Sequence, residues 1–151
     1  MPVYSGDVSR ESILKHVQTK VGDWVGKKKP LIEEAEKAYM KVLELKPAPP
    51  PRWVIASAAR VGTLWGRFVA ELRAAPIPRD WTRHGPIPGG NGLTYEEVRA
   101  AYYKQLDEAS APQREMARSA FKKCSELSLK LRYADDFSRT CDSWLAKNMA
   151  P

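Results

Sequence analysis

The chain has 151 residues with 25 Lys or Arg against 18 Asp or Glu, so its formal net charge is +7 at pH 7. Hydrophobic residues make up 43% of it and there are only 2 Cys, which excludes disordered, collagen-like and disulfide-dense chains and suits one domain over residues 1–151. No apolar run approaches the roughly 18 residues that cross a bilayer. The start, Met1 to Asp7, lacks the basic and apolar regions of a signal peptide.

Apolar residues recur at helical spacing throughout, which predicts an all-α chain. A first helix is expected to start near Asp7 or Ser9, and its end is weakened by Gly22, Gly26 and Lys27–Lys29. A second is expected from Pro30, which suits a first helical turn, to about Lys46. Its apolar residues share one face: Leu31, Ala35, Ala38, Tyr39, Val42 and Leu45.

Pro47-Ala48-Pro49-Pro50-Pro51 predicts a stiff connector, since proline rings restrict the backbone before them. A third helix, about Arg52 to Ala75, is apolar around most of its circumference and should be central. Small residues fall on it every four positions and should let a neighbouring backbone approach closely: Ala58, Gly62, Gly66, Ala70 and Ala74. Arg60 and Arg67 lie on its polar stripe.

Residues 76–93 contain four Pro and four Gly, which predicts a long loop without regular structure. Long ordered loops are often functional, and this one presents Trp81, Arg83 and His84 as candidate anchors for a partner. The alternative is that Trp81 folds back over the helices. Thr94 and Glu97 form a capping-box pattern that starts a fourth helix. A fifth follows the break at Ala111-Pro112, and Asp135 can cap a sixth.

Part of the second helix resembles the second-helix signature of a tetratricopeptide repeat. It reads Ala35-x-x-x-Tyr39-x-x-Val42-Leu43-x-Leu45-x-Pro47. A weaker copy runs from Ala117 to Leu127, and Ala58-x-x-Val61-Gly62-x-x-Trp65 is similar to the first-helix half. The connectors at 47–51 and 76–93 are too long for a regular period of about 34 residues. The resemblance therefore implies degenerate repeats, built as tetratricopeptide-like antiparallel helical hairpins.

Four strings, at residues 35–45, 51–58, 74–78 and 138–145, are similar to the C-terminal region of large tetratricopeptide-repeat proteins of myxobacteria and their relatives. Some of those belong to the adventurous gliding-motility machinery. The resemblance implies an exported, periplasmic scaffold that acts through protein contacts and has no catalytic residues. It also implies that the chain is a fragment whose export signal lies upstream. Residues 80–92 are an insertion relative to the family pattern.

Cys124 and Cys141 lie at equal distances from the predicted turn at 131–134, so an antiparallel hairpin places them at the same height. They can be two buried thiols or a disulfide, which needs an oxidising compartment. Together with the envelope resemblance, this symmetry favours the disulfide.

Catalytic and metal chemistry find little support in the sequence. His16 and His84 are far from each other in the sequence and far from both cysteines, so no familiar metal-ligand spacing occurs. The adjacent carboxylates, such as Glu33 and Glu34, point roughly 100° apart on a helix, unlike a facing acid–base pair. We expect no enzyme, no cofactor and no small-molecule substrate.

The favoured hypothesis is a non-enzymatic protein–protein interaction scaffold of a cell-envelope complex that binds other envelope proteins. Its candidate contact residues are Arg60, Arg67, Trp81, Arg83 and His84. The alternative is a cytoplasmic nucleic-acid-binding helical domain that uses the basic surface, including Lys27–Lys29. Those lysines can also simply close the first helix.

Overall fold

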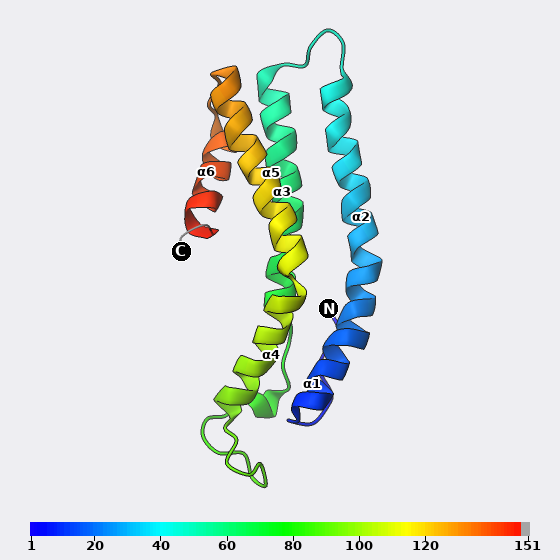
Figure 1. Cartoon of the computed structure of the whole chain (residues 1–151), viewed down its shortest axis with the longest axis vertical. Coiled ribbons are helices and arrows are strands. Elements are labelled where there is room, and N and C mark those ends of the chain that lie inside the picture. The colour runs from blue at the N-terminus through cyan, green and yellow to red at the C-terminus, as the bar shows by residue number, and fades with distance from the viewer. Residues whose placement is uncertain (149–151) are drawn as a thin grey trace. The chain divides into compact units, whose positions relative to one another are not determined.

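The structure, a computed structural model, describes residues 1–148, and its regular elements within that range are all helical (Figure 1). The predicted all-α class is confirmed. In chain order the elements are α1 (Arg10–His16), the π-helical η1 (Val17–Val21), α2 (Gly22–Met40), the 3-10 turn η2 (Lys41–Glu44), α3 (Pro51–Arg73), the 3-10 turn η3 (Arg79–Thr82), α4 (Tyr95–Ala109), α5 (Ala111–Leu131) and α6 (Asp136–Asn148).

These elements belong to two compact units. Unit 1 comprises residues 1–29 and 69–111, and unit 2 comprises residues 30–68 and the chain from residue 112 onward. Each unit therefore combines two stretches that are distant in the sequence.

Three helix starts have the side-chain caps that the sequence predicted. The Ser9 hydroxyl accepts from the Ser12 N–H at 3.2 Å, and Asp135 accepts from the backbone of Phe137 and Ser138 at 3.0 Å. At α4, Thr94 and Glu97 form a complete capping box. Because a capped end satisfies backbone donors that otherwise lack partners, the short polar side chains determine where these helices begin.

The expected break between the first and second helices is wrong. α2 runs through Pro30 without interruption, and Lys27–Lys29 lie inside it, so they do not close a helix. A proline ring inside a helix removes one backbone donor and crowds the carbonyl four residues earlier, here that of Gly26. The Lys28 ammonium pairs with the Glu71 carboxylate and lies 5.0 Å from the centroid of the Trp24 ring.

In unit 2 the core lies among α3, α5 and α6. Phe121 stacks on Trp144 with ring centroids 4.6 Å apart, and Ile55 is fully buried beside them. Cys124 and Cys141 are both fully buried, with Cα atoms 6.2 Å and sulfur atoms 2.07 Å apart, so the pair is placed to form the expected disulfide.

The row of small residues on α3 allows neighbouring groups to come close, as expected. The groups that do so are side chains of other helices and not a neighbouring backbone. A Cβ atom on Gly62 would lie 2.8 Å from the Phe121 ring, and one on Gly66 would lie 3.5 Å from the Trp144 indole nitrogen. The space left by these two glycines of α3 is therefore occupied by aromatic rings of α5 and α6.

The apolar face of the second predicted helix does not point into the core. Leu31 is 66% exposed and Leu45 is 43% exposed. The side of α2 that packs in unit 2 carries Ile32, which is buried, and Glu36, which accepts a hydrogen bond from the Trp65 indole at 3.0 Å. The buried edge of α2 is thus displaced around the helix from its longest apolar row.

Candidate protein-binding surface

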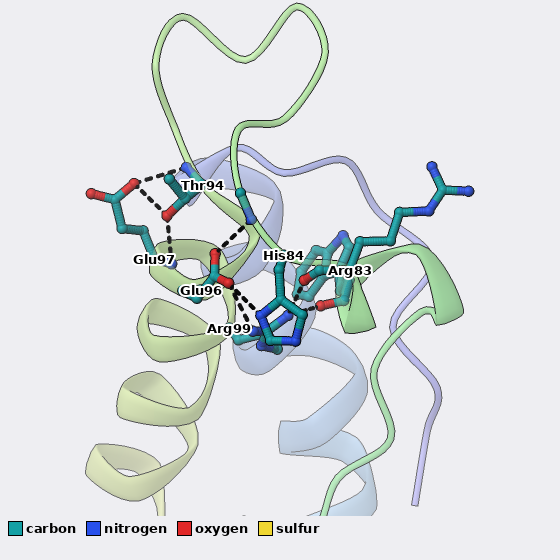
Figure 2. Close-up of polar contacts among 8 residues, drawn as sticks. Arg83, His84, Thr94, Glu96, Glu97 and Arg99 are labelled. Carbon is teal, nitrogen blue, oxygen red and sulfur yellow. Dashed lines mark hydrogen bonds and ion pairs between the residues drawn. The ribbon is translucent and has the colours of Figure 1, made fainter.

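The loop at residues 76–93 in unit 1 is more ordered than the sequence predicted. η3 forms one helical turn, and the chain then makes a narrow hairpin with an antiparallel bridge between Pro86 and Thr94. The Ile87 N–H donates to the Leu93 carbonyl at 2.9 Å, and the Gly90 N–H donates to the Ile87 carbonyl at 2.9 Å. Figure 2 shows this hairpin rising from the start of α4.

Positive backbone angles explain why the hairpin is rich in glycine. Gly85, Gly89 and Gly92 have φ of 83°, 72° and 89°, and Asn91 has φ of 49°. Residues other than Gly and Asn are strained when φ is positive. The glycines predicted to forbid regular structure are therefore what allow the chain to turn back on itself.

Side chains from the first two turns of α4 hold the root of the hairpin, as Figure 2 shows. The Arg99 guanidinium donates to the Arg83 carbonyl at 2.7 Å and also to the Trp81 carbonyl. Glu96 accepts from the Gly85 N–H at 3.3 Å and lies 2.7 Å from Nδ1 of His84. These contacts tie both ends of the segment 81–85 to one helix.

Hydrogen bonds at the start of α4 favour the charged form of both carboxylates there. The pKa of Glu96 is lowered first by its backbone N–H and then by His84. The pKa of Glu97 is lowered by the Thr94 backbone N–H and then by the Thr94 hydroxyl. Both groups are therefore carboxylates at neutral pH and act as acceptors.

Trp81, one of the predicted contact residues, is only 3% exposed, so its ring is not presented on the surface. Its ring packs on Tyr4 and Tyr102 with centroid distances of 4.7 and 5.9 Å. Trp81 therefore folds back over the helices, which was the alternative expectation. His16 lies in the same cluster, 4.9 Å from Tyr4, and burial followed by the charge of Lys20 lowers its pKa. Trp81 thus fastens the loop to unit 1.

Arg83 and His84 remain accessible. Their side chains are 65% and 84% exposed, and the Arg83 guanidinium lies 3.2 Å from the Asp80 carboxylate. Together they form a polar, exposed edge of unit 1 at the root of the hairpin.

A groove of about 400 Å³ lies beside this root, between α1 and α4. Its apolar lining includes the buried side chains of Ile13 and Val98 and the half-exposed Leu93 of the hairpin. Charged and amide groups line it as well: Arg10, Glu97, Lys104 and Gln105. An apolar floor with polar groups around it is the usual composition of a site that receives a side chain of a partner.

Arg60 and Arg67 belong to unit 2 and not to the unit that carries the loop. Both are exposed on α3, and the Arg60 guanidinium lies 5.4 Å from the centroid of the Phe137 ring. The five predicted contact residues therefore fall into separate sets: two on α3, two on the hairpin edge, and the buried Trp81.

Sequence reasoning missed Arg99 and the groove. Arg99 follows the capping box by two residues, and helical spacing alone directs it toward the preceding loop. The groove combines residues from α1, the hairpin and α4, which no local pattern links.

Within residues 1–148, no group of three or more His, Cys, Asp or Glu side chains is placed to hold a metal ion. Over the same range no helix has both the length and the apolar character that crossing a bilayer requires. No protein-family model matches the sequence, and neither the curated proteins nor the solved structures include a match.

Proposed function

We propose that this chain is a non-enzymatic module that binds another protein and serves as a scaffold or adaptor. The groove beside the hairpin root carries the proposal. Its floor is apolar, its rim is charged, and its volume of about 400 Å³ accommodates one or two side chains of a partner segment. Fixed walls reduce the ordering cost of binding: the Leu93 carbonyl accepts from the Ile87 N–H, and Glu97 is held in the capping box with Thr94.

The setting that we propose is a periplasmic complex of the cell envelope, of the gliding-motility type, with a tetratricopeptide-like hairpin arrangement. The resemblance of the 35–47 segment and the strings similar to myxobacterial proteins support this setting. The placement of Cys124 against Cys141 is compatible with an oxidising compartment.

Two neighbouring alanines of α4 provide a matched test. Both are exposed, but Ala101 lines the groove and Ala100 does not. Leucine is a good helix former at either position. Ala101→Leu should fill the groove and reduce partner capture, while Ala100→Leu should leave capture unchanged.

The experiment is a pull-down with the full chain as bait from a myxobacterial envelope extract, with and without nuclease treatment, followed by mass spectrometry. Proteins retained by wild type and by Ala100→Leu but lost with Ala101→Leu would support the proposal. Equal retention by all three baits would contradict the groove as the binding site. Retention that disappears on nuclease treatment would contradict the protein-binding function itself.

A further inference from the structure

A row of apolar side chains on α2, η2 and the extended residue that follows η2 lies outside the packed side of these elements in unit 2. Leu31 and Leu45 are 66% and 43% exposed, Ala38 is exposed, and Ala35 and Val42 are half-buried. We call these five residues the α2 stripe. They are spaced by four, three, four and three residues, which is the pattern along which two helices pack against each other.

Two opposite charges lie along one edge of the α2 stripe. Glu34 and Lys41 are both exposed and are seven residues apart, so two helical turns bring them to the same side. Neither takes part in an ion pair within residues 1–148. The edge is therefore acidic toward the start of the α2 stripe and basic toward its end.

This charge order distinguishes between the two directions in which a second copy could pack on the α2 stripe. If a second copy packs on the α2 stripe antiparallel, Glu34 of each copy lies opposite Lys41 of the other, and two equivalent attractive pairs form. A parallel two-fold arrangement places this edge of each copy on opposite sides of the contact, so Glu34 and Lys41 do not face each other there. The midpoint of the antiparallel pairing lies beside Ala38, whose small side chain allows the two helices to approach closely.

We propose that the α2 stripe is a self-association surface on which a second copy of this chain packs antiparallel, with Glu34 of each copy paired to Lys41 of the other. Such a two-fold contact uses the same residues on both sides. Five side chains cover less than the total area of about 1,200–2,000 Å² typical of stable complexes, so the dimer is weak and depends on concentration. The surface lies in unit 2, whereas the groove of the proposed function lies in unit 1.

Charge reversal provides a test with an internal rescue. Glu34→Lys makes both charges of the edge positive, and Lys41→Glu makes both negative. Each variant alone should weaken the dimer about tenfold, because two attractive surface pairs become repulsive. An equimolar mixture of the two variants restores opposite charges across the contact and should dimerise as wild type does.

The measurement is sedimentation equilibrium of the full chain between about 1 µM and about 1 mM, the range of dissociation constants expected for a small interface. Circular dichroism verifies that every variant keeps its helix content. Wild-type dimerisation, its loss in each variant and its recovery in the mixture would support the proposal. A monomer at every concentration, or a dimer insensitive to both reversals, would overturn it.

Ala101→Leu serves as a control that separates the two proposals. It fills the groove in unit 1 and should not change the mass distribution of the chain. Loss of partner capture with intact dimerisation would support both proposals together. Dimerisation that responds to Ala101→Leu but not to the charge reversals would place self-association on the groove and overturn the assignment to the α2 stripe.

Discussion

At Gly62, α3 makes a close contact with a ring of α5, and this contact depends on the absence of a single carbon atom. A Cβ there would lie 2.8 Å from the buried Phe121 ring, and that ring is itself stacked on Trp144. A ring held in this way cannot move without disturbing the core beside the cysteine pair. The size of one residue thus sets the spacing of two helices.

Gly62→Ala is expected to destabilise the protein by about 1–3 kcal/mol, because it overpacks a filled core. Gly26→Ala is the matched control, since a Cβ on Gly26 meets nothing within 4 Å on an exposed turn of α2. Alanine is preferred over glycine in a helix by about 1 kcal/mol, so the control should stabilise the chain slightly. Urea unfolding followed by circular dichroism measures both, and equal shifts in the same direction would contradict the close contact.

At the scale of the element, α2 shows how tertiary context overrides a local signal. Proline lacks the N–H that a helix interior uses, and its ring crowds the preceding turn. α2 nevertheless continues through Pro30, with the buried Ile32 and the Glu36–Trp65 hydrogen bond following directly. Those contacts hold the second half of the helix in unit 2 and offset the local cost.

Pro30→Ala should therefore raise the free energy of unfolding, by up to about 3 kcal/mol, because it restores one backbone donor and removes the steric clash. Pro112→Ala is the control. Pro112 occupies the first turn of α5, where the N–H has no intrahelical partner, so its effect should stay within about 0.5 kcal/mol. Thermal and urea unfolding would distinguish the two variants. An unchanged stability of Pro30→Ala would indicate that the helix does not continue through residue 30.

The hairpin root is a second case at this scale. A loop with four glycines would ordinarily be assigned to irregular structure, yet Arg99 and Glu96 bind three successive residues of it, Arg83, His84 and Gly85. The order of the loop comes from the helix that follows it. The hairpin is consequently a defined surface rather than a linker.

At the scale of the whole molecule, the two cysteines join α5 to α6 within unit 2. They are 17 positions apart, both are fully buried, and they contact the core that includes Phe121 and Ile55. A cross-link of this length restricts the unfolded chain and stabilises the folded state by about 3 kcal/mol in the chain-entropy estimate.

Oxidised wild-type protein should therefore unfold at a higher urea concentration than the reduced protein, and a thiol count should find free cysteines only after reduction. In hydrogen exchange, reduction should speed the exchange of amides in α5 and α6 more than that of amides in α4. Identical midpoints under oxidising and reducing conditions, with free thiols in both, would show that the cysteines are two buried thiols.

The sequence by itself determined the helical class, the starts of α1, α4 and α6, and the height at which Cys124 meets Cys141. These features follow from spacing and capping chemistry, which act over a few residues. Only the tertiary structure decided that Trp81 is buried, that α2 passes through Pro30, and that the α2 stripe is left exposed. Each of these depends on which distant side chains arrive at the same place, and local periodicity contains no information about that choice.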